Sequence, residues 1–142
     1  MQTKIKAIFA TLLLIGCVST LMAQQPSNGK REKKKNLVVK EWNLKAGSQT
    51  PFLDNVVTFD EQGRKIEEVE YATYGQKYRI VYEYEGNETK CVREVEYNDK
   101  NKVVSVKKIE YNADGSKAKQ YTYLPNGKLK STKIYERIYR EQ

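Results

Sequence analysis

The sequence contains no histidine, and only two of its 142 residues are cysteine. Without histidine, Ser-His-Asp catalysis, Cys-His catalysis and histidine-ligated metal sites are excluded. No glycine-rich phosphate loop precedes a helical pattern, so no cofactor is expected. After residue 23 there is also no apolar run long enough to cross a bilayer.

The one long apolar stretch lies at the start of the chain. A short basic start precedes the run AIFATLLLIGCVSTLMA, and Ala23 is followed by polar Gln24. This pattern is typical of a signal peptide over residues 1–23, cleaved after Ala23, and predicts an extracytoplasmic protein, either periplasmic or secreted. A second interpretation stays open, because residues 14–17 resemble a bacterial lipobox. Cys17 would then be lipidated and would anchor the chain to the outer membrane.

The positive charge is concentrated near the N-terminus. The chain has a formal net charge of +8, but from residue 36 onward it holds 19 basic and 17 acidic residues. Residues 24–35 are polar, basic and without apolar periodicity, which predicts a flexible basic linker; contact with an anionic surface is the sharper alternative. Residues 36–142 form one domain, in which Cys91 is expected to be a small buried hydrophobe without a disulfide partner.

From residue 36 onward the sequence consists of short strand-like runs separated by glycine and asparagine. A pattern of apolar, polar and aromatic residues occurs six times, ending at Phe59, Tyr71, Tyr84, Tyr97, Tyr111 and Tyr123. The spacing of 12 to 14 residues fits one strand plus one turn. The sequence therefore predicts an all-β domain, a single antiparallel up-and-down meander curled toward a half-barrel. Eight strands are expected, near residues 36–43, 52–59, 64–71, 77–84, 90–97, 103–111, 117–123 and 129–139.

The segments between these runs predict defined turns. Residues 60–63, 112–115 and 124–127 each fit a type I turn that ends on a left-handed glycine and forms a G1 bulge, and Asn101 takes that place in 98–101. Residues 73–76 and 85–88 are expected to be two-residue hairpins. The pairs predicted from these turns are Tyr111 with Lys117, Ile109 with Lys119, Tyr123 with Leu129, Tyr97 with Val103, Tyr71 with Tyr78, and Tyr82 with Cys91.

Propagated through the sheet, this register places all strand aromatics on one face. The expected members of that face are Leu53, Val57, Phe59, Val69, Tyr71, Tyr78, Ile80, Tyr82, Tyr84, Cys91, Val95, Tyr97, Val103, Ile109, Tyr111, Tyr121, Tyr123 and Leu129. The opposite face is expected to carry charged residues with a smaller apolar set: Glu68, Glu70, Glu83, Glu94, Glu96, Glu110, Lys108, Lys130, Ile66, Val81, Val92, Val104, Val106 and Ile134.

Three phrases carry a family resemblance: Tyr111-Asn-Ala-Asp-Gly115, Phe59-Asp-Glu-Gln-Gly63 and Tyr123-Leu-Pro-Asn-Gly127. They resemble the tyrosine, aspartate, two variable residues, glycine phrase of YD-repeat proteins. Over roughly residues 53–135 the chain is similar to small secreted YD-repeat-like β-meander proteins of Bacteroides-like bacteria, whose function is unknown. The resemblance implies an extracytoplasmic, repeat-built sheet and no catalytic residues. The units here are shorter than YD repeats, and only Phe59 is followed by aspartate.

The sequence is unusually rich in tyrosine, with eleven such residues. They are interpreted first as a core of mutually covering rings, and second as an open platform on which a sugar ring, a peptide or a base would stack. The candidate ligand face comprises Tyr78, Tyr82, Tyr84, Tyr97, Tyr111, Tyr121 and Tyr123. Nucleic acid is not expected as a partner, because glutamate shares the aromatic face and the strongest basic cluster lies in the linker.

Three classes of function follow. The first is a non-enzymatic secreted or envelope-associated module that binds a protein, or self-associates through its sheet edges. The second is a glycan-binding module. The third is a small hydrolase that uses paired carboxylates among Glu67, Glu68 and Glu70, or Glu94 and Glu96. It ranks last because these residues alternate with apolar ones as on a solvated strand face. No catalytic or metal-binding residue is assigned.

Overall fold

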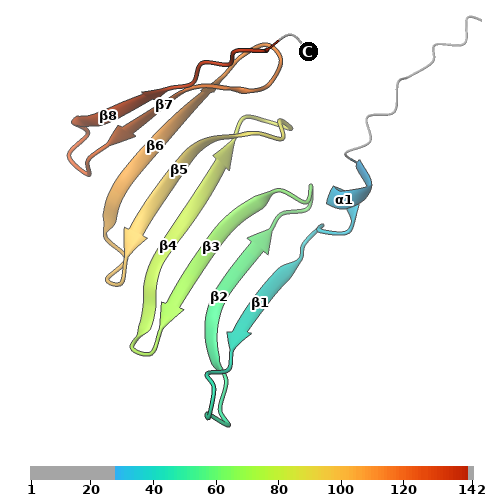
Figure 1. The fold of residues 1–142 in the computed structure, drawn as a ribbon, viewed down its shortest axis with the longest axis vertical. Coiled ribbons are helices and arrows are strands. Elements are labelled where there is room, and N and C mark those ends of the chain that lie inside the picture. The colour runs from blue at the N-terminus through green and yellow to red at the C-terminus, as the bar shows by residue number, and fades with distance from the viewer. Residues whose placement is uncertain (1–27, 141–142) are drawn as a thin grey trace, which may run out of the picture.

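The computed structural model describes residues 28–140, which form one antiparallel sheet with its strands in chain order (Figure 1). The strands are β1 Val38–Asn43, β2 Phe52–Phe59, β3 Lys65–Ala72, β4 Gly75–Tyr84, β5 Cys91–Asn98, β6 Val103–Tyr111, β7 Lys117–Tyr123 and β8 Leu129–Ile134. The predicted eight-stranded meander is therefore confirmed. The sheet stays open, with β1 and β8 at its two edges. The predicted signal peptide, including Cys17, and residues 24–27 lie outside the described residues.

Residues 28–35 differ from the predicted flexible linker. Asn28–Glu32 forms a short helix, α1, beside the turn between β2 and β3 (Figure 1). The backbone amide of Asn36 donates to the carbonyl of Asp60 at 2.9 Å, and the Lys34 ammonium lies 4.8 Å from the centroid of the Phe59 ring. A side chain at Gly63 would collide with the carbonyl oxygen of Arg31. These contacts are made largely by backbone, which apolar periodicity does not report. No helix among residues 28–140 is long and apolar enough to span a membrane.

A β-bulge follows the strand-ending aromatic residue in six of the seven hairpins. In the hairpin of β6 and β7, Tyr111 pairs with Lys117 and Glu110 pairs with Lys119, so Ala118 is an extra residue. The other five bulges lie beside Phe59, Tyr71, Tyr84, Tyr97 and Tyr123. Because a strand alternates its side chains between two faces, each extra residue turns the next side chains to the opposite face.

These bulges explain which predicted pairs are right. The pairs next to the turn are confirmed for Tyr111 with Lys117, Tyr123 with Leu129, and Tyr97 with Val103. The pairs that were carried past a bulge or into a misjudged turn are wrong: Ile109 pairs with Gln120, Tyr71 with Gln76, and Tyr82 with Glu94, while Cys91 pairs with Tyr84. Residues 85–90 separate Tyr84 from Cys91, so the predicted two-residue turn there is also wrong.

The prediction of a single aromatic face is wrong for the same reason. We name the two faces after their buried residues. The Val95 face carries Val56, Glu67, Val69, Tyr71, Arg79, Val81, Glu83, Arg93, Val95, Tyr97, Val106, Lys108, Glu110, Lys119, Tyr121, Tyr123 and Ile134. The Ile109 face carries Val57, Phe59, Glu68, Glu70, Tyr78, Ile80, Tyr82, Tyr84, Glu94, Glu96, Lys107, Ile109 and Tyr111. Successive strand-ending aromatics therefore alternate between the faces.

The glycine positions of the turns are confirmed. Gly63, Gly115 and Gly127 have φ angles of 71°, 79° and 81°, and Asn101 takes the same left-handed conformation at 54°. In the first of these turns Gly63 donates its amide to the Asp60 carbonyl at 3.0 Å, and Asp60 donates to the Arg64 carbonyl at 2.9 Å. Turn chemistry is local, so the sequence predicts it well even where the register beyond it is shifted.

The sheet has very little core. Within residues 29–140 the buried hydrophobic side chains are Val69, Val95 and Ile109, with exposed fractions of 7%, 4% and 5%. Val95 lies between Val81 and Val106 in the strands on either side. Among the described elements, contacts join only strands that are adjacent in the sheet. Most side chains on both faces therefore keep some contact with solvent.

Candidate functional site

Six of the seven candidate tyrosines have a cation from the same chain over the ring. Their partners are Lys77 for Tyr78, Lys65 for Tyr82, Arg64 for Tyr84, Arg79 for Tyr97, Lys90 for Tyr111 and Lys108 for Tyr123, at 4.2 to 5.8 Å from the ring centroids. Such contacts stabilise by about 0.5–1 kcal/mol each at exposed sites. A ring face covered in this way is occupied already, which makes these residues poor stacking platforms.

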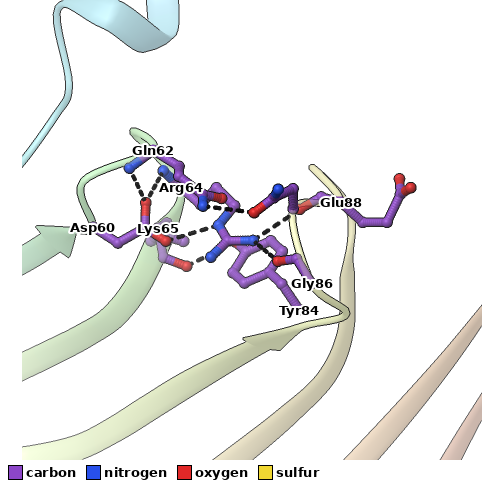
Figure 2. Close-up of polar contacts among 8 residues, drawn as sticks. Asp60, Gln62, Arg64, Lys65, Tyr84, Gly86 and Glu88 are labelled. Carbon is purple, nitrogen blue, oxygen red and sulfur yellow. Dashed lines mark hydrogen bonds and ion pairs between the residues drawn. The ribbon is translucent and has the colours of Figure 1, made fainter.

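At Tyr84 the covering cation is itself held in place by several hydrogen bonds (Figure 2). Arg64 lies over the Tyr84 ring, and its Nε donates to Asp60 Oδ2 at 2.7 Å. Its Nη1 reaches the neighbouring turn and donates to the carbonyls of Gly86 and Glu88, at 2.7 and 3.1 Å. Burial would raise the pKa of Asp60, but hydrogen bonds from the backbone and side chain of Arg64 outweigh it and lower that pKa. We call Asp60, Arg64 and Tyr84 the turn clamp, and its role is structural.

The hydroxyl groups of the Ile109-face tyrosines are also engaged. Tyr82 donates to Glu68 Oε2 at 2.8 Å, and burial together with this bond raises the pKa of the phenol. A hydrogen bond to Glu70 raises the pKa of Tyr78 to about 12, and burial raises the pKa of Tyr84 to about 12. These phenols stay neutral at physiological pH, so none of them is poised as an acid or a nucleophile.

Tyr121 differs from the other candidates, because among the described residues its ring carries no cation. It lies in a row across the Val95 face, in which Glu83, Arg93, Lys108 and Tyr121 are successive cross-strand partners. This row borders a shallow hollow of about 740 Å³, also lined by Glu85, Val92, Ile109, Glu110, Tyr111 and Tyr123. We call this hollow the Tyr121 groove.

The polar groups of the Tyr121 groove are only partly paired. Arg93 forms an ion pair with Glu83, and the Tyr121 hydroxyl donates to Glu110 Oε2 at 3.3 Å. The Lys108 ammonium lies 5.6 Å from the Tyr123 ring. A second hollow of about 350 Å³, lined by Arg93, Lys108, Tyr123 and the 124–127 turn, lies next to it. One uncovered ring among donors and acceptors suits a ligand with a flat apolar side and several hydroxyls, or a polar peptide surface.

The paired carboxylates considered for hydrolysis are occupied by cations. Glu67 pairs with Arg79 at 3.2 Å, Glu68 with Lys65 at 2.8 Å, and Glu94 with Lys107 at 3.3 Å. The bond from Lys65 lowers the pKa of Glu68, whereas a general acid needs a raised pKa. Cys91 is half-buried, and burial raises the pKa of its thiol, so it resembles the predicted small hydrophobe more than a reactive nucleophile.

Residues 28–140 contain no group of three or more Cys, Asp or Glu side chains that could hold a metal ion. A scan against protein-family models and a search of curated proteins give no match for the chain. The candidate site therefore depends on geometry alone.

Sequence reasoning included Tyr121 among the candidates but missed Arg93 and the way in which Glu83, Lys108 and Glu110 surround the ring. Glu83, Lys108 and Glu110 were expected on the opposite face from Tyr121, and the bulges bring them to the same face. A partial signal was available in the basic residues at strand starts, because Arg64, Lys65 and Lys90 stand at the starts of β3 and β5. The other three covering cations, Lys77, Arg79 and Lys108, lie within strands.

Proposed function

We propose that the chain is an extracytoplasmic, non-enzymatic binding module that holds a protein partner on the Val95 face, around the Tyr121 groove. The observation that carries this proposal is that the described residues form a single sheet with no second layer packed on either face. Stable domains normally pack two layers around a core, whereas here three side chains are buried and no described element covers either face. A partner that supplies the second layer would bury Tyr121, Val106 and the adjoining valines.

The catalytic alternative has little support from the side chains. The candidate carboxylates are ion-paired, and the pKa of Glu68 is lowered. The resemblance to secreted YD-repeat-like β-meander proteins and the leader-like N-terminus support a role outside the cytoplasm. The fold supports a platform rather than a pocket, because the hollows on it are shallow and open to solvent.

Glycan binding is a second candidate, favoured by one observation. Tyr121 offers an open ring beside Arg93, Lys108 and Glu110, and glycan sites combine such a ring with charged hydrogen-bonding groups. A glycan array with the wild-type chain and the Tyr121→Ala variant tests it. Binding of a glycan that the variant loses would favour this candidate, and an empty array would remove it.

Site-specific photo-crosslinking tests the leading proposal. A photoreactive phenylalanine analogue at position 121 is compared with the same analogue at position 74, where Tyr74 is a tyrosine at a turn tip, 72% exposed. In an envelope extract of the organism that encodes the chain, we expect a discrete protein adduct at position 121 and none at position 74. Equal adducts at both positions, or none at either, would contradict a partner site on the Val95 face.

A further inference from the structure

The charge of the domain is unevenly distributed along the sheet. Residues 117–140, which comprise β7, β8 and the segment after it, hold seven Lys or Arg residues and one acid, Glu136. Residues 36–116 hold 12 basic and 15 acidic residues. The last hairpin is thus a basic edge on a sheet that is otherwise slightly acidic.

The cations of this edge are not neutralised within the described part of the chain. The ion pairs of residues 28–140 involve Lys35, Arg64, Lys65, Lys77, Arg79, Arg93 and Lys107, and none comes from residues 117–140. Elsewhere in the sheet, cross-strand ion pairs such as Arg79 with Glu67 and Lys107 with Glu94 neutralise the positive side chains. The edge is therefore a field of positive potential available to an anionic partner.

The backbone of β8 also has an open side. Tyr135 donates its amide to the carbonyl of Ala118 at 3.0 Å, which fixes which residues of this segment face β7. In an antiparallel pair hydrogen-bonded residues alternate, so the amides of Ser131 and Lys133 also point toward β7. The amide and carbonyl groups of Thr132 and Ile134 point away from the sheet, where no described segment pairs with them.

The side chains along this edge are exposed on both faces. All residues from Leu129 to Ile134 are exposed, and Ile134 is 74% exposed. Lys133 lies on the Ile109 face and Ile134 on the Val95 face, with Lys119 as the cross-strand neighbour of Ile134. Beyond them, Ile138 and Tyr139 are 80% and 83% exposed. An exposed strand with apolar residues and an open ladder is the usual acceptor for β-strand addition.

We propose that the outer edge of β8 accepts an extended acidic segment of another polypeptide as a ninth strand. The backbone of that segment bonds to the open groups of Thr132 and Ile134. Its acidic side chains meet Lys133 on the Ile109 face, and its apolar side chains cover Ile134 on the Val95 face. Lys119 and Lys130 add to the positive potential of the edge. A second β8 is a poor occupant, since two basic edges repel. Strand β1 itself carries no net charge, because its one lysine, Lys40, is followed by Glu41, and the basic residues 30–35 lie only near its start. The inference rests on the proposed function only in treating the chain as a binding module.

Fluorescence anisotropy tests this inference with a defined probe. The probe is a labelled nine-residue peptide that alternates glutamate with valine or isoleucine. A control peptide of equal charge carries proline at every second position and cannot form a strand ladder. We expect the strand peptide to bind the full chain at least tenfold more tightly than the proline peptide. Equal binding of the two peptides would overturn strand addition in favour of a general polyanion surface. So would heparin, if it displaced the labelled strand peptide as effectively as the unlabelled strand peptide does.

Variants of the protein locate the binding edge. The double variant K130E/K133E is expected to weaken the strand peptide at least tenfold, whereas K100E/K102E, which reverses two exposed lysines in the turn before β6, leaves affinity within twofold. Thr132→Pro removes an outward amide and should also abolish binding; its melting curve shows whether it folds. Unchanged affinity in K130E/K133E would refute the site. Crosslinking at position 121 is read independently, so the failure of one proposal is distinguishable from the failure of the other.

Discussion

Tyr84 donates a hydrogen bond from its hydroxyl to the backbone carbonyl of Lys65, 2.7 Å away across the hairpin of β3 and β4. An equivalent bond occurs two strands later, from Tyr111 to the carbonyl of Cys91 at 2.7 Å. In the last hairpin Arg137 Nη1 donates to the carbonyl of Lys117 at 2.9 Å. The three acceptors are 26 residues apart. Comparable bonds therefore reach the first residue of every second strand from β3 to β7.

Removing the Tyr84 hydroxyl tests the structural role of this bond. Tyr84→Phe is expected to lower the free energy of unfolding by about 1 kcal/mol, because the Lys65 carbonyl loses its side-chain donor. Tyr123→Phe is the matched control, since the Tyr123 hydroxyl makes no hydrogen bond to a described residue. Urea denaturation of both variants measures the difference. Equal effects of the two substitutions would show that the bond contributes nothing.

Arg64→Lys tests the turn clamp. Lysine keeps the charge but lacks the guanidinium fork that reaches Asp60 and the carbonyls of Gly86 and Glu88 at once. We expect a loss of about 1–2 kcal/mol in thermal or urea unfolding. Arg93→Lys is the control, because Arg93 is more exposed and pairs with Glu83 alone, and it should cost under about 0.5 kcal/mol.

Acid unfolding should depend on Asp60. Its pKa is lowered in the folded chain, so the carboxylate stabilises the fold above its unfolded pKa, and this contribution disappears as the pH falls through the folded pKa. Stability should therefore decline below about pH 4. Asp60→Asn should lower stability at neutral pH by about 1 kcal/mol and flatten this decline.

Asparagine is a fair replacement at position 60, because Asn98 makes the same two turn bonds, to the amides of Lys100 and Lys102, that Asp60 makes to Gln62 and Arg64. Urea titrations at pH 2 to 7 measure the effect. A variant whose pH profile parallels that of the wild type would show that Asp60 does not control the acid limb.

Truncation of the small core should be costly where the valines meet. Val95→Ala removes two methyl groups from a side chain that is 4% exposed, and the expected loss is about 1.5–3 kcal/mol. Val104→Ala is the control, since Val104 is 36% exposed and is the extra residue of a bulge. It should cost less than about 0.5 kcal/mol. Equal losses would mean that Val95 is not the centre of the core.

The strand count and the turn positions were predictable because they depend on local chemistry. Glycine at 63, 115 and 127 and asparagine at 101 adopt the expected left-handed conformations. The register was predicted correctly only for the pairs beside the turns at 98–101, 112–115 and 124–127. One extra residue per bulge reverses the face of everything beyond it, and aromatic spacing near 13 residues fits alternating faces as well as one face.

The sequence predicted which residue type forms the candidate site, but not where on the sheet the site lies. Periodicity identifies seven tyrosines, and nearby cations remove six of them as open platforms. Whether Lys65 lies over Tyr82 or Arg79 over Tyr97 depends on the register between neighbouring strands, which the bulges shift. Tyr121 is distinguished only when that pairing is known.

Amide hydrogen exchange of the free chain, followed residue by residue by NMR, tests the central claim that the sheet is open at β8. We expect Ser131, Lys133 and Tyr135 to be protected by β7, and Thr132 and Ile134 to exchange rapidly because their amides face solvent. Equal protection of all five amides would mean that another strand already covers the edge, through closure or self-association, and would contradict the account.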